Sequence, residues 1–63
     1  MENKYTDNEL KCFITEYLAN KKKIKELIRD REILTEKGTN EYYKVKSRNE
    51  ELSMILDEYK VKP

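Results

Sequence analysis

The spacing of apolar residues is the feature that most restricts how this chain can fold. In the first half of the sequence they recur at intervals of three and four residues, the period that returns side chains to one face of an α-helix. Thr6 and Glu9 precede the series with the spacing of a capping box. No glycine or proline interrupts it before Gly38. We therefore predict a first helix over about residues 7–37. Its apolar stripe is Leu10, Phe13, Tyr17, Ile24, Leu27 and Leu34.

The only glycine of the chain marks the predicted turn. Gly38 stands where a helix commonly ends in a left-handed residue, and glycine adopts that conformation at the lowest cost. We therefore expect Gly38 at positive φ and a turn over residues 38–40. Thr39 or Asn40 would then cap the next helix through its side-chain oxygen.

A second amphipathic pattern follows and predicts a helix over about residues 40–60. Arg48 is the polar exception in a stripe formed by Val45, Leu52, Ile55 and Tyr59. Because the connection is short, the two helices should be antiparallel neighbours. The predicted fold class is all-α, an antiparallel two-helix hairpin that forms a single domain over residues 1–63.

Folding the chain at Gly38 also predicts a register between the helices. Arg48 would lie beside Arg31, and Leu52 beside Leu27. The second helix would then end near the level of Asn20 and leave the start of the first helix uncovered. Burying one such apolar side chain stabilises by about 1.5–3 kcal/mol, so we expect the exposed group to form a homodimer or to bind another protein. These residues are Leu10, Phe13, Ile14, Tyr17 and Leu18.

Composition argues against several classes of function. The chain has 14 Lys+Arg and 13 Asp+Glu residues, a net charge of +1, whereas nucleic-acid binders gather a basic excess on one face. The basic run at residues 21–23 is interpreted as a solvated helix face, with contact to an acidic partner as the alternative. There is no histidine, and Cys12 is the only cysteine, so no metal site is predicted. No apolar stretch approaches the roughly 18 residues of a membrane span. An unpaired thiol favours the cytoplasm.

Several short segments occur together in one known family. They are Ile-Lys-Glu-Leu at 24–27, Gly-Thr at 38–39, Val45 early in the second helix, and Glu-Tyr at 58–59. This layout resembles the Spo-zero-E-like aspartyl-phosphate phosphatases, small helical hairpins of sporulating bacilli. The resemblance implies an enzyme that dephosphorylates a response regulator and so acts as a negative regulator of the sporulation phosphorelay.

The family signature, Ser-Gln-Glu-Leu-Asp, falls on residues 49–53, which read Asn-Glu-Glu-Leu-Ser. A rival register on residues 53–57 recovers the serine, leucine and aspartate but puts Met and Ile at polar positions. The first register implies an exposed catalytic edge on the second helix. An amide there would orient the attacking water, and a glutamate would accept its proton or pair with a receiver lysine. The implied catalytic residues are Asn49, Glu50, Glu51 and Ser53.

The resemblance implies no cofactor in this chain. A divalent metal, where the reaction needs one, would belong to the receiver domain of the phosphorylated response regulator. The alternative function is a non-catalytic helical module that binds a response regulator or self-associates, and the missing glutamine and aspartate of the signature favour it. A small DNA-binding regulator is a third hypothesis, weakened by the balanced charge.

Overall fold

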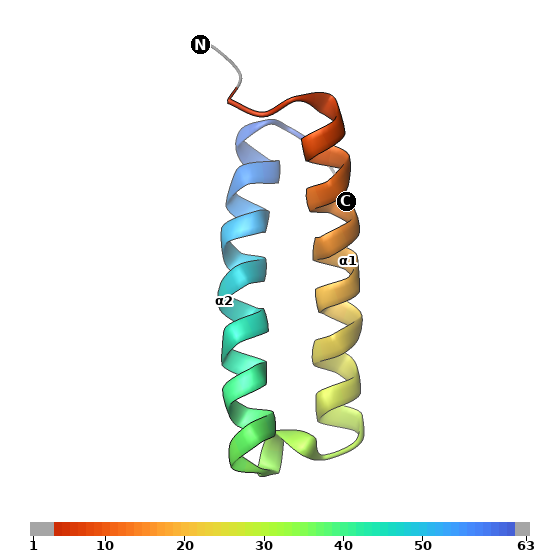
Figure 1. The fold of residues 1–63 in the computed structure, drawn as a ribbon, viewed down its shortest axis with the longest axis vertical. Coiled ribbons are helices and arrows are strands. Elements are labelled where there is room, and N and C mark those ends of the chain that lie inside the picture. The colour runs from red at the N-terminus through yellow and green to blue at the C-terminus, as the bar shows by residue number, and fades with distance from the viewer. Residues whose placement is uncertain (1–3, 62–63) are drawn as a thin grey trace.

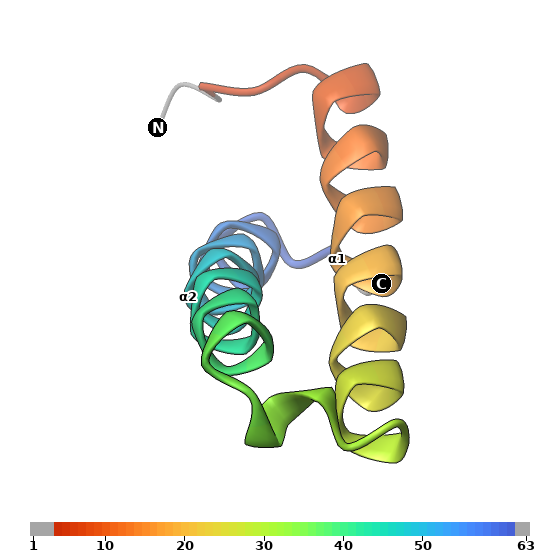
Figure 2. The same cartoon turned by 60° about the horizontal axis from the view of Figure 1, so that its bottom comes forward.

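The computed structural model describes residues 4–61 and consists of two long helices joined by a short 3-10 helix (Figure 1). Helix α1 spans Asp7–Arg29, η1 spans Glu32–Leu34, and α2 spans Glu36–Glu58. The long helices lie antiparallel along each other, and the described residues include no strand. Figure 2 shows that their axes are inclined, because α2 is foreshortened more strongly than α1 in that view. The predicted all-α antiparallel hairpin is confirmed.

The N-terminus of α1 forms as the sequence predicts. The Glu9 N–H donates to Thr6 Oγ1 at 3.2 Å, and the Thr6 N–H donates to the Glu9 carboxylate at 3.1 Å. These reciprocal bonds satisfy two backbone donors that have no partner inside the helix. The predicted capping box is therefore confirmed.

The turn comes earlier than the sequence predicted. Helix α1 ends at Arg29, and Arg31 (φ 58°) adopts the left-handed conformation that we expected at Gly38. The Arg31 N–H donates to the carbonyl of Ile28 at 3.1 Å, which closes the helix end. The predicted first helix over 7–37 is therefore wrong in its C-terminal bound, because a non-glycine residue ends the helix.

Helix α2 also begins earlier than predicted. Thr35, rather than Thr39 or Asn40, is its N-cap, and Thr35 Oγ1 accepts from the Gly38 N–H at 2.9 Å. The predicted turn at 38–40 and the predicted start of the second helix at 40 are therefore wrong. The threonine cap satisfies one of the free amides of the first turn.

Gly38 has a different role from the one we predicted. It lies in the first turn of α2, and no glycine of the described chain has positive φ. A Cβ at Gly38 would overlap the carbonyl of Glu32 and would lie 2.9 Å from Thr35 Oγ1. Glycine is needed here because the backbone of η1 passes directly against α2, not because of an unusual conformation.

The core lies along the line where the two helices meet. Its buried apolar side chains are Leu10, Leu27, Leu52 and Leu56. In α2 the stripe differs from the predicted one, because Asn49 and Leu56 are buried while Arg48 and Ile55 are only half-buried. Both stripes alternate spacings of three and four, so the pattern alone did not separate them.

The register between the helices also differs from the prediction. Arg48 lies opposite Glu16 instead of Arg31, and Asn49 lies opposite Tyr17. This is a displacement of roughly two heptads along α1, and it follows from the earlier turn. Both helices have 23 residues, so each covers the other along its length.

The matched lengths remove the uncovered end that we predicted for the first helix. Leu10 is buried, whereas Phe13, Ile14 and Tyr17 are half-buried against the rest of the hairpin. Of the five predicted interface residues, Leu18 remains exposed. The predicted overhang is therefore wrong. Self-association through these side chains stays a prediction, but an uncovered helix end no longer supports it.

The open end of the hairpin is held by an aromatic cluster. The segment before α1 crosses to the end of α2 (Figure 1), where the Lys4 N–H donates to the Tyr59 hydroxyl at 2.7 Å. The Tyr5 ring packs edge-on against Phe13, with 5.0 Å between the ring centres, and its centre lies 5.8 Å from that of the Tyr59 ring. Tyr59 therefore lies beside Lys4 and Tyr5, not near Asn20 as the predicted register required.

Candidate functional site

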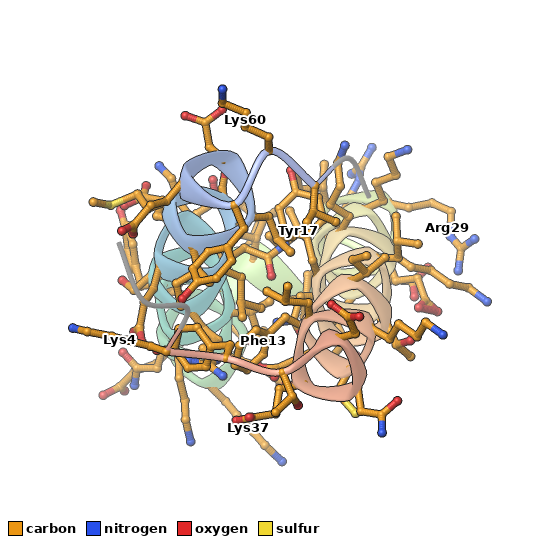
Figure 3. The ribbon with its side chains drawn as sticks, turned by 90° about the horizontal axis from the view of Figure 1, so that it is seen from above. Lys4, Phe13, Tyr17, Arg29, Lys37 and Lys60 are labelled. Carbon is orange, nitrogen blue, oxygen red and sulfur yellow. The ribbon has the colours of Figure 1, made fainter. Side chains whose placement is uncertain are left out.

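The line where α1 and α2 meet has two exposed edges, and each forms a shallow groove. One groove, of about 400 Å³, we call the Tyr17 groove; its lining is Tyr17, Ile24, Lys46, Asn49, Glu50, Ser53 and Met54. The other, of about 500 Å³, we call the Arg48 groove; it includes Glu16, Asn20, Lys37, Lys44, Val45 and Arg48. Figure 3 views the hairpin along its length and shows Phe13 and Tyr17 between the helices, with Lys37 extending outward.

Two of the four predicted catalytic residues are exposed in the Tyr17 groove. Glu50 and Ser53 both line it, and both side chains are open to solvent. They are three residues apart on α2, a spacing that makes side chains neighbours on a helix surface. The groove therefore presents a carboxylate and a hydroxyl close together beside the Tyr17 ring.

Asn49 occupies a different place from the one we predicted. It is only 7% exposed and lies on the buried stripe of α2, not on an exposed edge. Its Nδ2 donates to the Tyr17 carbonyl oxygen at 3.1 Å, and its Oδ1 is buried without a partner. The amide is thus already used between the helices, and the predicted exposed position of Asn49 is wrong.

Glu51 faces the opposite edge. Its Oε1 accepts from Arg48 Nη1 at 3.1 Å. Arg48 also forms a two-point contact with Glu16, with Nε–Oε2 at 2.7 Å and Nη2–Oε1 at 3.2 Å. The guanidinium lies 6.0 Å from the centre of the Phe13 ring. Arg48 is therefore balanced by two carboxylates, and the predicted approach of Arg48 to Arg31 is wrong.

This pair changes the acidity of both partners. Hydrogen bonding to Arg48 lowers the pKa of the Glu16 carboxyl below its usual value, although partial burial acts in the opposite direction. The same hydrogen bonds raise the pKa of Arg48. Both groups are therefore charged at neutral pH, and the pair joins α1 to α2.

Of two lysines near the Tyr17 groove, Lys21 belongs to the basic run at residues 21–23, and Lys46 was not singled out from the sequence. Lys46 Nζ lies 5.8 Å from the centre of the Tyr42 ring, and Lys21 Nζ lies 5.6 Å from that of Tyr17. Neither lysine forms an ion pair within residues 4–61. The sequence could have pointed to Lys46, because it precedes Glu50 by four residues and so shares its side of the helix.

The described residues contain no converging group of three Asp, Glu, Cys or His side chains that could hold a metal ion. Within the same part of the chain, no helix has the length and apolar character needed to cross a membrane. Comparison with known proteins finds no match, either to a family model, to a curated protein or to a solved structure.

Proposed function

We propose that this hairpin is a protein phosphatase that hydrolyses the aspartyl phosphate of a response regulator controlling sporulation. One observation supports it most directly. Glu50 and Ser53 stand where the family signature has glutamine and aspartate, and both are exposed in the same groove. A rigid helix that presents two polar groups one turn apart is suited to positioning a water molecule beside a phosphoryl group.

The reaction requires mainly positioning and control of charge. The water oxygen forms a bond to phosphorus while the bond from phosphorus to the aspartyl oxygen breaks. The electron pair of that bond stays on the aspartate as its carboxylate. Glu50 accepts the proton of the attacking water and transfers it to the phosphate product, while the Ser53 hydroxyl donates to a phosphoryl oxygen. Any divalent metal belongs to the receiver domain.

The other two predicted residues do not contact the attacking water in this proposal. Asn49 places Glu50 and Ser53 at the level of Tyr17, because its amide bond to the Tyr17 carbonyl joins the helices at that level. Glu51 lies with Arg48 on the opposite edge, so it is remote from the water that Glu50 would bind.

The test is the rate of dephosphorylation of a phosphorylated sporulation receiver, with and without the purified hairpin. Replacing Glu50 with Ala should slow the reaction at least about tenfold, or about 1.4 kcal/mol of transition-state stabilisation. Glu51→Ala is the matched control, since it removes an adjacent carboxylate from the other edge. Equal activity of the Glu50 variant and the wild type would contradict the proposed role of Glu50.

A second candidate is a helical module that binds the receiver without catalysis. It is favoured because Asn49 is bonded to Tyr17 and Glu51 to Arg48. Only Glu50 and Ser53, of the four predicted residues, then remain as exposed polar groups in the Tyr17 groove. A wild-type protein that binds the phosphorylated receiver but leaves its dephosphorylation rate unchanged would support this candidate over the phosphatase.

A further inference from the structure

We infer that Lys46, assisted by Lys21 over the Tyr17 ring, contacts the phosphoryl group of the partner in the Tyr17 groove. This inference rests on the proposed function and adds a residue that positions and neutralises the anion. The family signature on residues 49–53 does not include either lysine. The charges and aromatic contacts near the Tyr17 groove support this role.

Both edges of the hairpin carry lysines that are outside ion pairs. On the Arg48 groove, Lys37 and Lys44 form no ion pair within the described residues, while Arg48 is paired with Glu16 and Glu51, and Lys23 with Glu41 at 3.4 Å. Near the Tyr17 groove, Lys46 and Lys21 lie over aromatic rings and pair with no carboxylate of the described chain. Positive charge is therefore available for a partner on this edge.

The aromatic rings also limit where the ammonium groups lie. A cation is attracted to the face of a tyrosine ring, so Lys46 is favoured over Tyr42 and Lys21 over Tyr17. Lys46 and Glu50 both line the groove, one helical turn apart. A phosphoryl group bound beside Glu50 is therefore within reach of the flexible Lys46 side chain.

The chemistry of the proposed site requires such a cation. A phosphoryl group is an anion, and the Glu50 carboxylate beside it would repel it. Lys46 in the groove offsets the carboxylate, and Lys21, over the Tyr17 ring that lines the groove, adds a further positive charge nearby. The groove should therefore prefer the phosphorylated receiver over the unphosphorylated one, since electrostatic complementarity favours the partner of opposite charge.

The experiment compares the affinity of the hairpin for a sporulation receiver domain with and without beryllofluoride, which mimics the phosphoryl group. Lys46→Gln should weaken binding to the beryllofluoride form by about tenfold and leave binding to the free form unchanged. Lys46→Arg should retain most of the affinity, because it keeps the charge. Lys44→Gln is the matched control, since Lys44 is an exposed lysine of α2 that lines the Arg48 groove instead.

The outcomes separate this inference from the proposed function. A wild-type protein that dephosphorylates the receiver, with a Lys46→Gln variant that binds the beryllofluoride form equally well, overturns the inference and leaves the phosphatase proposal in place. An equal loss of affinity for both receiver forms also overturns it, because Lys46 would then contact the receiver away from the phosphoryl group. A wild type that neither binds nor dephosphorylates the receiver overturns both. Circular dichroism of each variant verifies that the hairpin is intact.

Discussion

The amide of Asn49 donates to the backbone carbonyl of Tyr17 at 3.1 Å and so joins α2 to α1 at the floor of the Tyr17 groove. This bond leaves the other side of the amide, Oδ1, buried without a partner. A buried polar residue at a seam position costs stability but restricts the ways in which two helices can pair. Asn49 therefore helps to set the register of the hairpin, and that register places Glu50 and Ser53 beside Tyr17.

Replacing Asn49 with Leu should raise the free energy of unfolding by about 1–2 kcal/mol, because it removes the buried acceptor that has no partner. The same change should lower the specificity of helix pairing. Urea unfolding measures the first effect, and sedimentation measures any new self-association. A loss of stability in the Leu variant would show that the bond to Tyr17 outweighs the cost of Oδ1.

Gly38→Ala should destabilise the hairpin by about 1–3 kcal/mol, because the new Cβ would overlap the Glu32 carbonyl. This is opposite in sign to the usual effect of the substitution in a helix, where alanine is favoured by up to about 1 kcal/mol. The control is Asn40→Ala, at an exposed position of the same helix. Thermal unfolding in which both variants have a higher midpoint temperature than the wild type would contradict the close approach of η1 to α2.

Arg31→Gly and Lys60→Gly should each stabilise the hairpin by about 0.5–1 kcal/mol. Both residues have positive φ, at 58° and 56°, where a side chain is strained and glycine is not. Arg29→Gly is the comparison within the last turn of α1, and it should destabilise because glycine is a poor helix former. The midpoints of denaturant unfolding give the order of the three variants.

Acid should remove the contribution of the Glu16–Arg48 pair to stability. The pKa of Glu16 is lowered by its hydrogen bonds to Arg48, so the folded state holds the charged form more strongly than the unfolded chain does. The contribution is therefore fully present above the usual pKa of 4.5 and is lost as the pH falls through the lower folded-state value. The free energies of unfolding of the wild type and Glu16→Gln, measured against pH, should converge in acid. Parallel curves would exclude this coupling.

Tyr5→Ala should weaken the open end of the hairpin, because Tyr5 contacts both Phe13 and Tyr59. The expected loss is about 1–2 kcal/mol, the scale of an aromatic pair together with its buried area. Hydrogen exchange should accelerate at the start of α1 and the end of α2 more than near the turn. Tyr59→Phe, which removes only the acceptor for the Lys4 N–H, should have a smaller effect.

Part of the candidate site was predictable from the sequence. Glu50 and Ser53 are exposed polar residues of the second helix, as the pattern indicated. The placement of Asn49 was not predictable, because stripes through Arg48 and through Asn49 have equivalent spacing. The folded structure selects the second one. Asn49 is short enough to bond the Tyr17 backbone, whereas the longer Arg48 side chain reaches Glu16 at the edge of the seam.

The sequence by itself determined that the chain forms two antiparallel helices, that α1 begins with the Thr6–Glu9 capping box, and that Leu27 and Leu52 belong to the core. The tertiary structure decided the turn and the register. In a heptad pattern, a shift by whole heptads keeps the same faces in contact, so periodicity leaves several registers open. The left-handed Arg31, the Thr35 cap and the close approach at Gly38 select one of them, because these interactions form only when α1, η1 and α2 are packed together.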